Sequence, residues 1–147
     1  MNSLKPVSIL LVDDNRDHAD IMIDALEEFN IKNIIHHVED GEEAILFLNN
    51  SGAYEDSKGF PTPDLIFLDI RMPRQDGIET LKLIKQSSDF AYIPVVMVST
   101  STSPEEISEC HRLGASGYLS KPIEFDALAQ KMKEINYYWM LVSDTSL

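Results

Sequence analysis

The stretch Val7-Ser8-Ile9-Leu10-Leu11-Val12-Asp13-Asp14 is a short apolar run that ends on two carboxylates. A continuous apolar run of this length is typical of a strand buried on both faces of a parallel sheet. Similar runs recur at residues 64–68 and 93–98, and two less apolar segments, at about 33–38 and at 117–120, are also expected to be strands. Apolar residues spaced by three and four positions lie between the runs and predict helices, the first set being Ala19, Met22, Leu26 and Phe29. This alternation predicts an α/β fold in which crossover helices cover a parallel sheet.

The remaining segments complete one (βα)5 unit. Helices are expected at 42–49 and 77–86, and a polar segment at 50–63 reads as a long surface loop. Ser103-Pro104-Glu105-Glu106 indicates a helix start, and Gly114 a helix end. The last helix starts at Phe125 and carries an apolar seam through Leu128, Met132, Ile135, Trp139 and Val142. We find no repeat or linker that would divide residues 1–147 into two domains.

Composition narrows the class of protein. The chain has 147 residues and a formal net charge of -13, which argues against direct binding to nucleic acid, because that binding needs Lys and Arg to neutralise phosphates. It has no apolar stretch long enough for a membrane span and no signal peptide, so we expect a cytoplasmic protein without membrane contact. The single cysteine, Cys110, is expected to fill the core.

The residues that end the strands carry the chemistry. In an open α/β sheet the ligand site lies outside the carboxyl ends of the strands. If the strand order is 2-1-3-4-5, the carboxylates at the ends of the first and third strands converge within a few ångströms. The side chains expected at this edge are Asp13, Asp14, Asp69, Ser99 and Lys121.

This set predicts phosphoryl chemistry with a metal ion. Crowded carboxylates draw in a cation, and oxygen ligands suit Mg²⁺ or Mn²⁺. Such an ion would let one carboxylate attack phosphorus, with Lys121 as a second positive charge and the Ser99 hydroxyl as a donor, to give an aspartyl phosphate.

Each residue alone would be read as a cap, turn or surface residue, and it is their joint placement that indicates a site. We interpret Asp76-Gly77 as a turn and helix start. The acidic run 39–43 is interpreted as a helix start whose side chains are exposed to solvent. We assign no function to the adjacent His36 and His37, which should point to opposite faces.

Four segments make the chain resemble the receiver domain of bacterial two-component response regulators over essentially its full length. The resemblance implies a flavodoxin-like doubly wound fold with a five-stranded parallel sheet. It is specific because all four segments occur in the family's order, namely Ile9 to Asp14, Asp69 to Gly77, Pro94 to Ser99, and Gly114 to Pro122.

The resemblance also implies a role for each residue. Asp69 would accept a phosphoryl group from a histidine kinase or phosphotransfer protein. Asp14 and Asp69 would ligate Mg²⁺ directly, Asp13 through water, and Arg71 through its backbone carbonyl. Lys121 would reach the phosphate, Ser99 and Tyr118 would form the conformational switch, and the Lys121-Pro122 bond would be cis.

Some residues differ from the usual family pattern, and others resemble a particular group within the family. Thr100 stands where a smaller residue is usual, and its bulk could slow attack by water on the phosphate. The loop ending in Phe60-Pro61-Thr62-Pro63, the region from Lys85 to Pro94 and the aromatic tail look like the regulators paired with bacteriophytochrome kinases. Because the receiver core takes up about residues 6–136, we expect a stand-alone regulator that acts on a partner protein.

The aromatic extension at 137–147 predicts an interface. Its large apolar side chains would form an exposed patch unless something covers them, so we expect a homodimer through the last helix and tail, with the helix after Ser103 as a second candidate element. The alternative is a tail that folds back on its own domain.

Other functions were weighed against this assignment. A phosphoacceptor would not turn over an external metabolite and is therefore not an enzyme in that sense. A Mg²⁺-dependent phosphohydrolase with the same nucleophile would need an acid two residues after Asp69, where this chain has Arg71. A flavodoxin-like cofactor binder would need a phosphate loop without the acids that follow the first strand. A receiver that only docks partners would not need the complete site.

Overall fold

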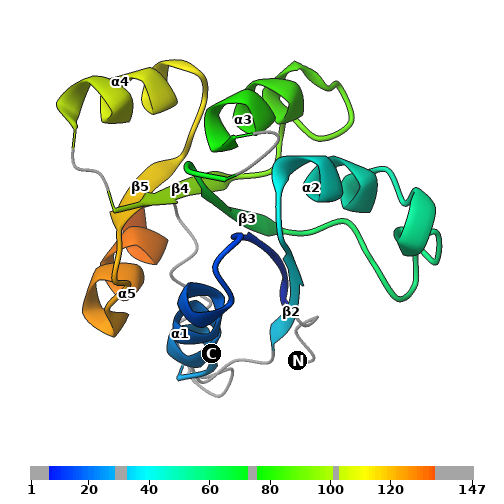
Figure 1. Ribbon diagram of the computed structural model, residues 1–147, viewed down its shortest axis with the longest axis horizontal. Helices are drawn as coiled ribbons and strands as arrows, with labels where there is room; N and C mark the ends of the chain where they lie inside the picture. The colour runs from blue at the N-terminus through cyan, green and yellow to red at the C-terminus, as the bar shows by residue number, and fades with distance from the viewer. Residues whose placement is uncertain (1–6, 29–32, 73–75, 101–102, 135–147) are drawn as a thin grey trace.

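The computed structural model describes residues 7–28, 33–72, 76–100 and 103–134. Strands and helices alternate along the chain, with one short 3-10 helix, η1 (Figure 1). Their bounds are β1 (Val7–Val12), α1 (Arg16–Glu27), β2 (Asn33–Val38), α2 (Gly41–Leu48), η1 (Gly52–Tyr54), β3 (Leu65–Asp69), α3 (Gly77–Gln86), β4 (Val95–Ser99), α4 (Pro104–Arg112), β5 (Gly117–Ser120) and α5 (Phe125–Glu134).

The five strands form one parallel sheet in the order β2-β1-β3-β4-β5, which confirms the predicted order. The register pairs Ile9 with Leu65 and Ile66 with Val95. β4 begins at Val95, two residues later than the apolar run suggested, because Pro94 has no N–H to donate and takes part only through its carbonyl.

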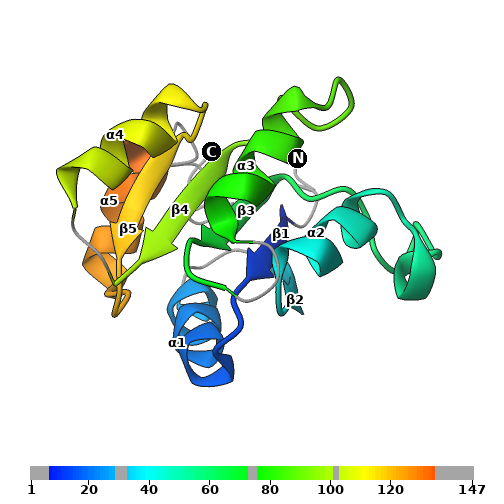
Figure 2. The same ribbon diagram turned by 45° about the horizontal axis from the view of Figure 1, so that its top comes forward.

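Helices cover both faces of the sheet. Figures 1 and 2 show α1 and α5 on one face, and α2, α3 and α4 on the other. Each face has its own core, with Met22, Phe67 and Leu128 in the first and Phe47, Leu81 and Cys110 in the second. Cys110 is fully buried, as expected for a core cysteine.

Side-chain caps start α3 and α4 where the sequence predicted a helix start. Asp76 accepts a hydrogen bond from the Glu79 N–H at 2.9 Å, and Ser103 caps α4 ahead of Pro104. Gly114 follows α4 with a φ of +105°, a left-handed conformation that favours glycine. The acidic run 39–43 does start a helix, but the expectation of a solvated run is wrong for Asp40, which is 1 % exposed and caps α2.

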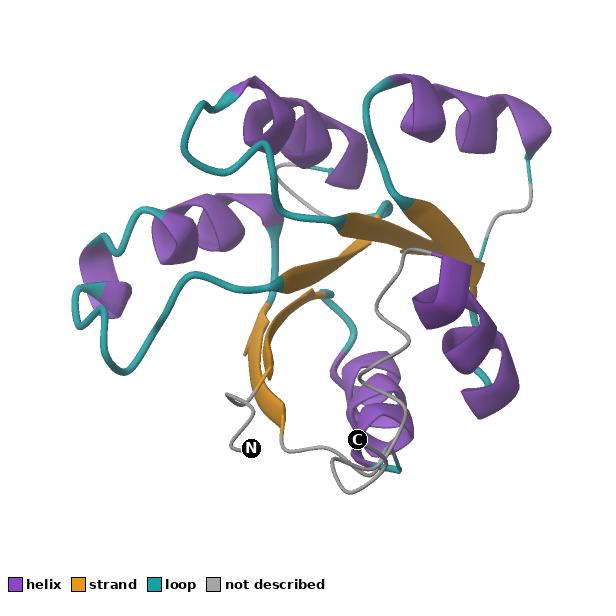
Figure 3. Ribbon diagram, turned by 180° about the vertical axis from the view of Figure 1, so that it is seen from behind, coloured by secondary structure: helices purple, strands orange, loops and turns teal. Residues whose placement is uncertain are grey.

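The long segment between α2 and β3 is anchored by aromatic side chains. Figure 3 shows it at the edge of the molecule, with η1 inside it. The ring centroids of Tyr54 and Phe60 are 5.2 Å apart. Both rings pack against Phe47, and Phe60 also packs against His36. The expected surface loop is therefore a packed one.

The described part of the last helix faces its own domain. Leu128 and Met132 are fully buried against the α1 side of the sheet. Phe29, Ile135 and the extension at 137–147, on which parts of the helix and interface predictions rest, lie outside the described residues. No helix in the described ranges has the length and apolar character needed to cross a membrane.

Candidate phosphoryl-transfer and metal site

Three carboxylates meet at the carboxyl edge of the sheet. Asp13 and Asp14 follow β1, and Asp69 is the last residue of the neighbouring strand β3. Ligand oxygens of the three lie within 4.8 Å of one another. Asp13 and Asp69 are buried, whereas Asp14 is exposed. The geometry thus brings together the acids that the sequence placed at one edge.

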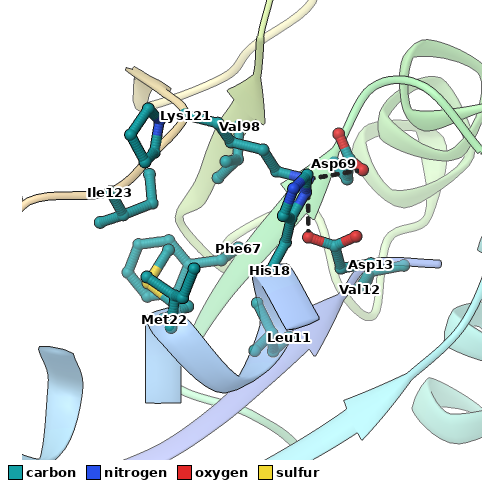
Figure 4. A pocket seen from close by; sticks show the side chains of 12 residues that line it. Leu11, Val12, Asp13, His18, Met22, Phe67, Asp69, Val98, Lys121 and Ile123 are labelled. Carbon is teal, nitrogen blue, oxygen red and sulfur yellow. Dashed lines mark hydrogen bonds and ion pairs between the residues drawn. The ribbon is translucent and has the colours of Figure 1, made fainter. Parts of the chain in front are cut away.

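The ammonium of Lys121 lies between the two buried acids. Lys121 Nζ is 2.8 Å from Asp13 Oδ2 and 3.1 Å from Asp69 Oδ2, and the lysine side chain is 8 % exposed (Figure 4). Its backbone N–H donates to the Ser99 carbonyl at 2.8 Å, which ties the end of β5 to the end of β4. The Lys121-Pro122 peptide bond is cis, as the family resemblance implied.

Burial controls the charge on Asp69. Loss of water raises the pKa of Asp69 from its ordinary value of 3.8 to about 6. The hydrogen bond and positive charge of Lys121 lower this pKa, and the nearby Asp13 carboxylate raises it again. Asp69 is therefore mostly ionised at neutral pH, which is the form that a nucleophile needs.

Gly77 explains how α3 can start directly against the end of β3. A Cβ added at Gly77 would lie 2.1 Å from the Asp69 carbonyl oxygen and 2.7 Å from Ile70 Cα, and both are backbone atoms. The Gly77 N–H also donates to the Ile70 carbonyl at 2.8 Å. The sequence indicated Gly77 only as part of a turn and helix start. Its lack of a side chain also allows the close backbone packing beside Asp69.

A cavity of about 230 Å³ opens onto the acids. It is lined by Asp14, Asn15, His18, Asp69, Arg71, Thr100 and Lys121. Thr100 is exposed at its rim, next to the fully buried Ser99. Six of the seven lining residues come from segments that follow the carboxyl ends of strands, and the seventh, Asp69, is the last residue of β3.

A chain of polar contacts leads from this cavity to α4. The Arg71 guanidinium is 3.0 Å from Glu106 Oε2, and the Tyr118 hydroxyl donates to Glu106 Oε1 at 3.5 Å. Burial raises the pKa of Tyr118 above its ordinary value of 10.0, a hydrogen bond with Ser99 lowers it, and the Glu106 charge raises it further. The predicted switch pair, Ser99 and Tyr118, is thus in contact, and Glu106 joins it to Arg71.

Two histidines at the site were missed by the sequence reasoning. His18 Nδ1 lies 3.0 Å from Lys121 Nζ, and His37 Nε2 donates to the Asp13 carbonyl oxygen at 2.7 Å. His18 could have been found, because the first turn of the helix after an acidic strand end faces the same edge. His37, to which no function was assigned, makes its contact because one face of β2 approaches the loop after β1.

The fold and these residues define the class of the protein. Residues 9–133 match the response regulator receiver domain, and the chain belongs to this family. The resemblance noted in the sequence is therefore confirmed.

Individual members of the family are similar to this chain over most of its length. The chain is 35 % identical over 135 residues to the probable methanogenesis regulatory protein FilR2 of Methanothrix harundinacea, covering 92 % of this chain and 84 % of that one. It is 33 % identical to the response regulator Rcp1 of Synechocystis sp., covering 92 % and 90 %. A crystal structure of Rcp1, described as a Mn²⁺-bound form, has a TM-score of 0.77 at 32 % identity, covering 92 % and 95 %.

The bacteriophytochrome response regulator AtBRR has a TM-score of 0.83 at 30 % identity, covering 95 % of this chain and 99 % of that chain. The predicted similarity to phytochrome response regulators is thus confirmed.

Proposed function

We propose that the protein is a stand-alone response regulator that accepts a phosphoryl group on Asp69. The observation that carries the proposal is the buried group formed by Asp13, Asp69 and Lys121, in which a nucleophilic carboxylate already lies beside a fixed positive charge. Coverage of nearly the whole length of Rcp1 and AtBRR supports a stand-alone regulator. The signal would then pass to a partner protein.

In the transfer step, an ionised oxygen of Asp69 attacks the phosphorus of a phosphohistidine. The new bond is Asp69 O–P, and the bond that breaks is P–N of the donor histidine, whose nitrogen keeps the electron pair and takes a proton from water. Lys121 stabilises the negative charge on the phosphoryl oxygens. The Ser99 hydroxyl can donate to one of these oxygens once Tyr118 releases it.

The acidic group suits a divalent metal ion. Asp14 and Asp69 would be direct ligands, Asp13 a ligand through water, and Arg71 a ligand through its backbone carbonyl. Oxygen donors around a partly exposed edge match the preferences of Mg²⁺ or Mn²⁺. Bound there, the ion would neutralise the charge of the acids and of the phosphoryl group.

The output would be a change at Ser99 and Tyr118. A phosphoryl group that recruits the Ser99 hydroxyl would remove a hydrogen bond from Tyr118, and the ring would reorient in the space beside α4. Glu106 contacts both Tyr118 and Arg71, so this change would reach the exposed face of α4. The donor would be a histidine kinase or phosphotransfer protein, and similarity to AtBRR supports a bacteriophytochrome kinase.

Phosphorylation can be tested with acetyl phosphate and Mg²⁺, followed by mass measurement of the intact chain. We expect the native chain to gain one phosphoryl group and Asp69→Asn to gain none. Asp89→Asn, which removes an exposed acid, is the matched control and should behave like the native chain. A native chain without added mass, or an Asp69→Asn chain with the same gain, would contradict the proposal.

We also propose that the chain forms a homodimer through its last helix and tail. The apolar spacing continues past Met132 to Trp139 and Val142, while the part up to Met132 already covers the sheet. Sedimentation of the full chain beside a chain ending at Asn136 tests this. We expect a dimer and a monomer respectively, whereas two monomers would refute the interface.

A further inference from the structure

The Lys121 ammonium has three acceptors within hydrogen-bond distance. They are Asp13 Oδ2 at 2.8 Å, His18 Nδ1 at 3.0 Å and Asp69 Oδ2 at 3.1 Å. An ammonium carries three protons and no acceptor, so these atoms can take one proton each. Figure 4 shows the lysine side chain reaching across the site, with His18 and the two acids around its end.

His18 is an uncharged partner in this arrangement. Because an ammonium can only donate, Nδ1 must be the bare nitrogen of the ring and the proton must sit on Nε2. His18 is half-buried on the first turn of α1, and the side chains of Lys121 and Asp69 are 8 % and 6 % exposed. Water has little access to replace this acceptor.

We infer that His18 is a positioning residue for Lys121 during phosphoryl transfer, an inference that rests on the proposed phosphorylation of Asp69. Both carboxylate contacts would change during that reaction. Asp69 becomes esterified to phosphorus, and the acids would be drawn to a metal ion. His18 carries no negative charge, forms no bond in the reaction and keeps its place on α1. It therefore holds the ammonium while the other two protons turn toward the phosphoryl oxygens.

A pair of substitutions separates this role from simple packing. The Oδ1 atom of asparagine occupies the same branch position as His Nδ1 and can accept the hydrogen bond. Leucine has the same branched shape without an acceptor. We would compare His18→Asn and His18→Leu, with Asp20→Asn on the exposed side of α1 as a control.

Rates of phosphorylation by acetyl phosphate at saturating Mg²⁺ give the first test. We expect His18→Leu to lower the maximal rate constant about tenfold, as loss of one hydrogen bond to a charged group implies. The half-saturating donor concentration should stay unchanged. His18→Asn should restore the native rate, and Asp20→Asn should not alter it. Equal rates in all chains, or equal losses for asparagine and leucine, would overturn the inference.

The second test does not depend on phosphorylation. In Mg²⁺-saturated protein labelled with ¹⁵N at the lysine side chains, where the acids are drawn to the ion, we expect a protected Lys121 ammonium signal in the native chain and in His18→Asn. The signal should be lost by rapid exchange in His18→Leu. A protected signal in His18→Leu refutes the positioning role even if the native chain cannot be phosphorylated, which would instead refute the proposed function. If His18→Leu does not fold, His18→Ala replaces it in both measurements.

Discussion

Replacing Asp69 by asparagine should stabilise the metal-free protein at neutral pH. Burial raises the pKa of Asp69 from 3.8 to about 6, so the folded chain holds this proton more tightly than the unfolded chain does. As pH rises from about 4 to 6, the unfolded state ionises first and the native protein loses stability relative to it. The native chain loses about 3 kcal/mol of unfolding free energy in total, and about half of this loss has developed by pH 5.

The measurement is urea unfolding in EDTA at pH 5 and pH 7.5. We expect the Asp69→Asn midpoint to exceed the native midpoint by roughly 1 M at pH 7.5 and by about half as much at pH 5. Asp89→Asn, on the surface, should track the native chain at both values. Added Mg²⁺ should narrow the gap by binding the native acids. A native chain as stable as Asp69→Asn at pH 7.5 in EDTA would refute the reasoning.

Three further substitutions test the supporting structure. Gly77→Ala should cost at least about 3 kcal/mol in urea unfolding, because the new methyl group would overlap the Asp69 carbonyl oxygen; a cost below about 1 kcal/mol would contradict this close approach. Glu106→Gln should lower the pKa of Tyr118 in a spectroscopic titration, since the Glu106 charge raises it, and an unchanged or higher value would disprove the contact. Phe60→Ala should cost about 2 kcal/mol by removing a half-buried ring from its aromatic neighbours, and native stability would show that the loop is not anchored.

Much of the fold followed from patterns that depend on backbone geometry. Apolar runs buried on both faces indicated β1, β3 and β4, and the strand-end rule located Asp13, Asp69 and Lys121 at one edge. These inferences need only the direction of each strand and the order of the sheet. They hold whatever rotamers the side chains adopt.

The contacts that the sequence did not predict depend on side-chain reach between distant segments. His18 and Lys121 are separated by 103 positions, and no local pattern relates them. The same holds for His37 and the Asp13 carbonyl. Charge patterning also cannot tell which acid in a run is turned inward, as Asp40 shows.

The hydrogen bond from His37 to the Asp13 carbonyl has a consequence for cooperativity. β2 is an edge strand, and edge elements are usually the first to open in local unfolding. Because His37 lies on β2 and Asp13 on the loop after β1, fraying of this outer strand would remove one of the contacts that hold Asp13 in place. By linkage, any ligand that needs Asp13 in position must also protect β2 from opening. Hydrogen exchange of the β2 amides, at the opposite edge of the sheet from β5, should therefore report whether a ligand is bound at the acidic site.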